Sequence, residues 1–176
     1  TLNQVNLRNA RIYSSDLQWS KISSAHIEDL RVERSNFSNV IFTSIHGKQC
    51  EFIQCYMFKA SFSNSSITST NFSLSNFSNA NIINTDFNYS NFSQNKMENT
   101  LMKNVKLKYG NFHNGAMQGI NLHDVIMIGA HFKGADMSNS TIKNMLAPVS
   151  DLSDVDMSNS HIINTHLENS VMQNSN

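Results

Sequence analysis

The stretch SNFSNANIINTDFNYSNFS, residues 75–93, carries a large apolar residue at every fifth position: Phe77, Ile82, Phe87 and Phe92. This spacing fits neither the 3.6-residue period of a helix nor the two-residue period of a strand. Most residues between these positions are Asn, Ser, Thr or Asp, which favour turns and exposed sites. The stretch therefore predicts a chain that turns once in every five residues.

The same period runs without insertion or deletion through the whole chain. Of the 35 positions from Leu2 to Met172 in this register, 33 hold Leu, Ile, Val, Phe or Met, and the exceptions are Gly47 and Ala147. A five-residue unit is too small to bury a core alone, so it must be stabilised by stacking on copies of itself. The chain is predicted to be a repeat solenoid.

A second register lies two residues before the first, and 30 of its 35 positions hold Ala, Ser, Thr, Cys, Val or Gly. Ile45 precedes Gly47 and Met145 precedes Ala147, so a large residue in one register accompanies a small residue in the other. Such exchanges indicate that both registers fill one interior of fixed volume. Two residues after each large position, 20 of 35 residues are Asn, Asp or Gly, which predicts a turn there.

A coil of 20 residues aligns identical residues in columns, which a coil of 15 residues does less well. The columns are Phe52, Phe72, Phe92, Phe112 and Phe132, and Met97, Met117, Met137 and Met157. Strands in stacked coils lie about 4.8 Å apart. We therefore expect an all-β, four-sided parallel solenoid of about nine coils, without inserted loops, as a single domain over residues 1–176.

Residues 75–93 and the segment GADMSNSTI at 134–142 resemble the pentapeptide-repeat superfamily, whose consensus is Ala-Asp/Asn-Leu-x-x. The resemblance implies a right-handed quadrilateral β-helix. This sequence departs from the consensus by placing Ser and Thr where Ala is usual and Met for Leu on one side. Because the chain begins and ends in phase without a capping element, we expect a segment of a longer protein or an end-to-end homo-oligomer.

The charge balance limits the partners of this chain. Thirteen Lys and Arg oppose thirteen Asp and Glu, so the formal net charge is zero. General nucleic-acid binding depends on excess positive charge, and we expect no nucleic-acid partner. No apolar run approaches the ~20 residues of a membrane span, so none is predicted.

The residues that could carry chemistry are few and scattered. Cys50 and Cys55 occupy the small inward register, so we expect buried thiols, and two thiols are too few for structural zinc. His26 and His46 lie one coil apart on an outer face, as do Asp136 and Asp156. Neither pair supplies converging metal ligands or a nucleophile with its base. We therefore predict no catalytic residues, no metal, no cofactor and no enzyme activity.

Apolar residues at outward positions are the most informative feature. They form a predicted protein-contact patch: Tyr89, Tyr109, Ile126, Ile128, Leu146 and Val149. Exposed apolar patches often mark partner surfaces. Proline in a sheet favours bulges and edges, so the alternative is a bulge at Pro148 that folds Ile126 and Leu146 back over the core.

Two function classes follow for a member of this family. The first is a non-catalytic scaffold or protein-binding module with a partner still to be identified, either in the bacterial cytoplasm or, as part of a secreted bacterial effector, in a host cell. The alternative is the DNA-mimic class, whose members bind DNA gyrase in quinolone resistance. Mimicry of DNA needs a strongly acidic surface, which the balanced charge does not provide.

Overall fold

The computed structural model describes residues 1–176 and consists of short strands joined by turns. It contains no helix of the length and apolarity that a membrane span requires. The strands are β1 (Leu2–Asn3), β2 (Arg11–Tyr13), β3 (Lys21–Ser23), β4 (Arg31–Glu33), β5 (Ile41–Thr43), β6 (His46–Lys48), β7 (Glu51–Ile53), β8 (Ser61–Ser63), β9 (Ser66–Thr68), β10 (Asn81–Ile83), β11 (Leu101–Lys103), β12 (Asn121–His123), β13 (Thr141–Lys143) and β14 (His161–Ile163).

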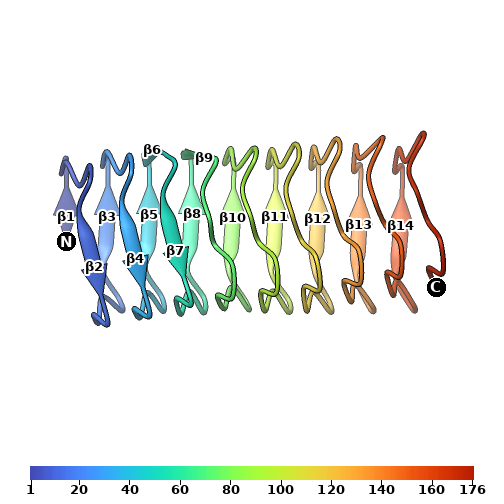
Figure 1. Cartoon of the computed structure of the whole chain (residues 1–176), viewed down its shortest axis with the longest axis horizontal. Helices are drawn as coiled ribbons and strands as arrows, with labels where there is room; N and C mark the ends of the chain where they lie inside the picture. Colours follow the sequence, from blue (N-terminus) through green and yellow to red (C-terminus); the bar gives the residue numbers. More distant parts are fainter.

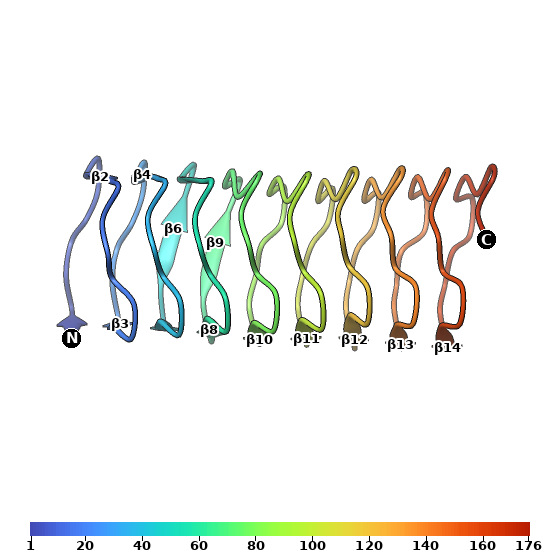
Figure 2. The same cartoon turned by 90° about the horizontal axis from the view of Figure 1, so that it is seen from below.

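These strands stack into a straight rod with the two chain ends at opposite ends (Figure 1). One side is a nine-stranded parallel sheet in the order β1-β3-β5-β8-β10-β11-β12-β13-β14. Shorter ladders, β2-β4-β7 and β6-β9, lie on two other sides, and Figure 2 shows β6 and β9 on adjacent coils. Isolated bridges such as Asp16↔Asn36 connect the coils on the fourth side.

Every ladder pairs residues that are 20 apart, as in Ile82↔Met102 and Asn6↔His26. Four ladders at this offset make a four-sided coil of 20 residues, and the nine strands of the large sheet give about nine coils. The predicted fold and coil count are confirmed. We name the sides by the residues that begin them: face 1 begins at 1, 21, 41 and so on, face 2 at 6 and 26, face 3 at 11 and 31, and face 4 at 16 and 36.

Both inward registers line one continuous apolar core with 41 buried residues, and at the two ends of the rod inward residues such as Leu2, Ile162 and Met172 are exposed. The predicted phenylalanine column runs along its length. Successive ring centroids are separated by 5.3 Å from Phe52 to Phe72, 4.9 Å to Phe92, 5.4 Å to Phe112 and 5.1 Å to Phe132. The rings are nearly parallel because each coil repeats the backbone of the one before it. Offset-stacked rings at this separation attract one another in addition to the burial of their surface.

Serine and threonine in the small register form hydrogen bonds with backbone groups of the adjacent coil. The Ser150 hydroxyl accepts a hydrogen bond from the amide of Ala130 at 3.2 Å and donates one to the carbonyl of Met127 at 3.1 Å. A buried hydroxyl without partners would destabilise the fold, whereas this one links two coils. The departure from the alanine of the consensus therefore costs little, because the hydroxyl pairs with the backbone.

All 35 predicted turn positions have a left-handed backbone. The 32 residues other than glycine have φ between 45° and 63°, and the three glycines have φ of 66° to 69°. Asn, Asp and Gly tolerate this conformation better than other residues. The predicted turn register is thus confirmed at every coil, including positions that hold less suitable residues.

Candidate functional site

The six residues of the predicted contact patch all lie on face 2, in the four successive coils between residues 86 and 150. We call this set the apolar corner patch: Tyr89, Tyr109, Ile126, Ile128, Leu146 and Val149. Tyr89 is 60% exposed, Tyr109 54% and Val149 61%, whereas Ile126 and Ile128 are half-buried. The structure therefore places all six residues on one face, where Tyr89, Tyr109 and Val149 at the corner are well exposed and the two isoleucines are less exposed.

Close packing between coils joins the two tyrosines to each other and places Tyr109 against Gly129 of the next coil. The rings of Tyr89 and Tyr109 are stacked, with centroids 5.5 Å apart and an angle of 14° between their planes. A Cβ atom on Gly129 would come within 2.7 Å of the Tyr109 ring. The glycine thus leaves space for this ring to lie over the next coil.

The coil at Pro148 continues the regular solenoid, so the bulge alternative is wrong. Leu146 donates its amide to the carbonyl of Val125 at 2.9 Å, and Val149 donates to Glu168 at 2.9 Å. In comparable turns the amide at the proline position bonds a side chain two residues earlier, as Ser153 does with Asp151. Proline can occupy this turn position because the amide it lacks is not needed in the ladder.

The corner of face 2 carries large apolar residues where most corners carry Asn, Asp or Gly. Tyr89 has φ of 62°, Tyr109 of 55° and the β-branched Val149 of 55°. The left-handed conformation costs roughly 1–2 kcal/mol for a residue other than glycine, and β-branched residues are its clearest outliers. Strain of this kind gathers at functional sites. Folding alone therefore gives no reason for these residues.

Two lysines stand at the border of the apolar corner patch. Lys106 precedes Ile126 in the same ladder of face 2, and Lys108 lies two residues further along its coil. Neither lysine takes part in any of the ion pairs within the chain. The patch is thus bordered by free positive charge.

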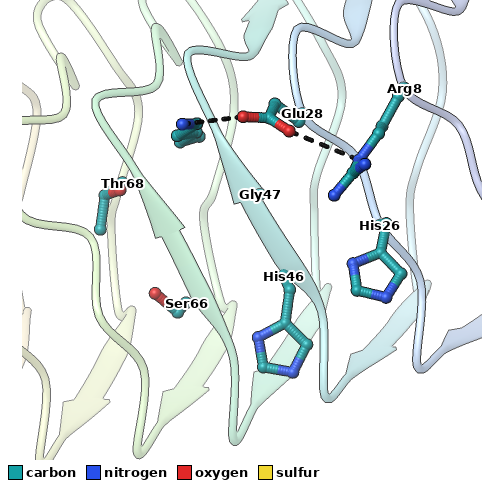
Figure 3. A pocket seen from close by; sticks show the side chains of 8 residues that line it. Arg8, His26, Glu28, His46, Gly47, Ser66 and Thr68 are labelled. Carbon is teal, nitrogen blue, oxygen red and sulfur yellow. Dashed lines mark ion pairs between the residues drawn. The ribbon is translucent and has the colours of Figure 1, made fainter.

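A second feature of face 2 is a shallow polar hollow of about 290 Å³ over Gly47. Its lining residues are Arg8, His26, Glu28, His46, Gly47, Lys48, Ser66 and Thr68 (Figure 3). A Cβ atom on Gly47 would overlap Cγ1 of Ile27, which fills the interior beneath it. The backbone at Gly47 therefore sits close to the core, and the side chains of the neighbouring coils stand around it.

Ion pairs organise one side of this polar hollow. Glu28 pairs with Lys48 at 2.9 Å and with Arg8 at 3.4 Å. The hydrogen bond from Lys48 lowers the pKa of Glu28, and the same bond raises the pKa of Lys48. On the other side, His26 and His46 stack with ring centroids 5.9 Å apart. The signal in the sequence was the alternation of Arg8, Glu28 and Lys48 at 20-residue intervals beside Gly47, which sequence analysis missed.

The remaining chemical candidates have structural roles. Cys50 and Cys55 are buried, as predicted, and burial raises the pKa of Cys55 to about 11. Asp136 and Asp156 are neighbours in the face 4 ladder, and each carboxylate accepts the amide two residues later, from Ser138 at 3.0 Å and from Ser158 at 2.9 Å. These carboxylates cap their own turns. No three His, Cys, Asp or Glu side chains converge on a common point.

Partial burial raises the pKa of Asp136, but hydrogen bonds from Ser138 and Gln118 more than offset this effect and leave the pKa below its usual value. A general acid at neutral pH needs a raised carboxyl pKa. Asp136 is therefore ionised and engaged in its turn.

Comparisons with known proteins agree with this architecture. The family model for pentapeptide repeats matches eight copies, at residues 55–94 and 111–144. No curated protein matches the chain significantly. Among solved structures, HetL, a protein involved in heterocyst differentiation regulation in the cyanobacterium Nostoc sp. strain PCC 7120, is 14% identical with a TM-score of 0.60. The match covers 97% of this chain and 88% of HetL.

Two trypsin-treated variants of QnrB1, a plasmid-mediated fluoroquinolone resistance protein, are 15% and 16% identical, each with a TM-score of 0.50 and coverage of 90% of both chains. At such low identity the likeness concerns the fold alone. The matches identify pentapeptide repeats at residues 55–94 and 111–144, and the unbroken five-residue period and the four-sided parallel solenoid give the whole chain the fold of the solved pentapeptide-repeat protein HetL.

Proposed function

We propose that this chain is a non-catalytic scaffold that binds a partner protein through the apolar corner patch. The observation that carries the proposal is the presence of Tyr89, Tyr109 and Val149 at left-handed turn positions, exposed and close together on one face. Each of these positions would be more stable with Asn or Gly. Binding of a partner supplies a reason for keeping apolar side chains there, since burial of their surface stabilises a complex.

The chemistry around the patch indicates the kind of partner surface that fits it. Aliphatic or aromatic side chains would pack on the stacked tyrosines and on Leu146. Acidic side chains at the edge of that surface would meet Lys106 and Lys108, which have no ion-pair partner in the chain. Complementary charges at the border of an interface chiefly accelerate association and select among partners. We therefore expect the partner to be an apolar surface with an acidic border.

The DNA-mimic alternative finds less support on the surface of this rod. The solved QnrB1 structures share the fold, and QnrB1 is a plasmid-mediated fluoroquinolone resistance protein. Here the acids are interspersed with bases: Glu28 lies between Arg8 and Lys48, and Arg31 pairs with Glu33 and Glu51. A duplex-like acidic stripe is therefore interrupted on faces 2 and 3. Strong inhibition of gyrase supercoiling by the purified chain would favour the alternative.

The test of the scaffold proposal uses substitutions that remove apolar surface without straining the turn. In the double variant Tyr109→Asn/Val149→Asn, both positions receive a residue suited to a left-handed turn. The control is Leu74→Asn, because Leu74 is also an exposed apolar residue at a left-handed turn but lies on face 3. Both variants are expected to fold as the parent chain does, which circular dichroism and thermal melting would verify.

The three proteins are then immobilised and compared as baits in extracts of the cells that express the chain. We expect the parent chain and Leu74→Asn to retain the same protein, and the double variant to lose it. The interaction should also be reproduced with that purified partner, with at least a tenfold weaker affinity for the double variant. Equal affinity of all three baits for the retained partner would exclude the apolar corner patch as the binding surface.

A further inference from the structure

The polar hollow over Gly47 contains hydrogen-bond donors that have no partner in the chain. The hydroxyls of Ser66 and Thr68 and the ring nitrogens of His26 and His46 make no hydrogen bonds to other protein groups. Figure 3 shows the two histidines along one side of Gly47, Ser66 and Thr68 along the other, and Arg8 and Glu28 above them. The hollow thus has free donors on several sides.

The single acidic side chain in this lining is already engaged. One carboxylate oxygen of Glu28 faces Nζ of Lys48, and the other faces Nε of Arg8. The side chain of Arg8 makes no hydrogen bond to protein groups, and its one ion pair is the 3.4 Å contact with Glu28. Counting ionised side chains in the lining, Arg8 and Lys48 against Glu28 leave one net positive charge. An incoming anion would therefore meet cationic and hydroxyl donors without displacing Glu28.

We propose that the polar hollow is a binding site for an oxyanion of the phosphate class, either inorganic phosphate or a phosphate monoester. A tetrahedral anion has several strong acceptor oxygens, which match donors arranged around a hollow rather than along a line. Arginine is suited to such oxygens because its planar fork can donate two hydrogen bonds at once. Gly47 contributes its backbone to the floor, since a side chain at this position would point inward toward Ile27.

The surroundings set an upper limit to the affinity. Asp29 lies on the adjoining corner, where its charge acts on Lys48, and Asp86 follows Ser66 in the ladder of face 2. Their negative charges weaken the field of the cations, and the hollow is open to solvent. We therefore expect a dissociation constant in the millimolar range. This site lies in different coils from the apolar corner patch. The proposal of anion binding is therefore independent of the proposed scaffold function.

The experiment is a titration of the ¹⁵N-labelled chain, followed by amide chemical shifts at pH 7 and constant ionic strength. One arm uses inorganic phosphate and a second uses O-phosphoserine, which separates the free ion from a monoester. Sodium chloride serves as the reference for ionic strength. We expect saturable shifts centred on Gly47, Lys48 and Ser66 with at least one of the two phosphates and no saturable shifts with chloride.

Three variants test the assignment of residues. Lys48→Gln should weaken binding about fivefold, whereas Glu28→Gln should strengthen it, because the lining then carries one more net positive charge. Lys143→Gln is the matched control, an exposed lysine at the same place in its repeat but on face 1, and it should bind as the parent chain does. Shifts that do not saturate, or equal affinities for the parent, Lys48→Gln and Glu28→Gln, would overturn the proposal.

Discussion

Replacement of Phe92 by alanine removes one ring from the middle of the phenylalanine column. Phe92 is fully buried and stacks between Phe72 and Phe112, with edge-on contacts to Phe77 and Phe87 at 5.6 Å and 5.4 Å. Loss of a buried phenylalanine costs about 3–5 kcal/mol, and each aromatic pair adds about 0.5–1.5 kcal/mol. Because these contributions overlap, we expect a loss of about 5 kcal/mol in the free energy of unfolding.

The assay is equilibrium unfolding in urea, monitored by circular dichroism. With a slope of about 2 kcal/mol per molar urea, the midpoint of the Phe92→Ala variant should fall by roughly 2.5 M. The control is Phe58→Ala, since Phe58 is the one phenylalanine outside the inward register and is half-buried beside Lys59. Its loss should cost about 1 kcal/mol. A loss below about 2 kcal/mol for Phe92→Ala, or similar losses for both variants, would refute the stabilising role of the column.

Three further outcomes are expected. Val149→Asn should raise the melting temperature, since relief of the left-handed valine is worth about 1 kcal/mol, and an unchanged value would contradict the strain. Hydrogen bonds from Asn144 and then His123 lower the pKa of Asp124 below its usual 3.8. The contribution of the Asp124 carboxylate to the free energy of unfolding is therefore fully present above pH 3.8. It is lost as the pH falls through the lower pKa of the folded state. Between pH 5 and pH 3 the melting temperature of the Asp124→Asn variant should thus fall less than that of the parent chain, and the two falls should differ by about one or two degrees. Burial and the raised pKa of Cys55 predict that a thiol reagent at pH 8 labels this residue only after unfolding; rapid labelling of the folded chain would disprove its burial.

The architecture could be predicted from the sequence because each five-residue unit has the same two requirements, a buried apolar side chain and a turn. Phe77 or Phe112 must face inward, and the Asn two residues later, Asn79 or Asn114, permits the turn. Since no unit is inserted or lost, the repeated units also determine the 20-residue register. Likewise, the inward small register predicted burial of both cysteines without knowledge of any long-range contact.

The sites could be predicted only in part. The repeat placed the apolar corner patch on one side, but it left open whether Pro148 lies in a bulge. The hydrogen bonds of Leu146 and Val149 to adjacent coils show that the coil at Pro148 is regular. The polar hollow was not predicted, because its lining comes from four coils and depends on side-chain directions and on the close approach of Gly47 to the core.

The sequence by itself thus determined the period, the inward and outward registers, the left-handed turns and the family resemblance, because these depend on local conformation and on repeated burial. Only the tertiary structure decided how far each outward side chain protrudes, that the Tyr109 ring lies over Gly129, and that Arg8, Glu28 and Lys48 form a chain of ion pairs. The physical reason is that these features depend on contacts between stacked coils. Residues 20 apart meet there, and their side chains adopt one arrangement among several that the same repeat allows.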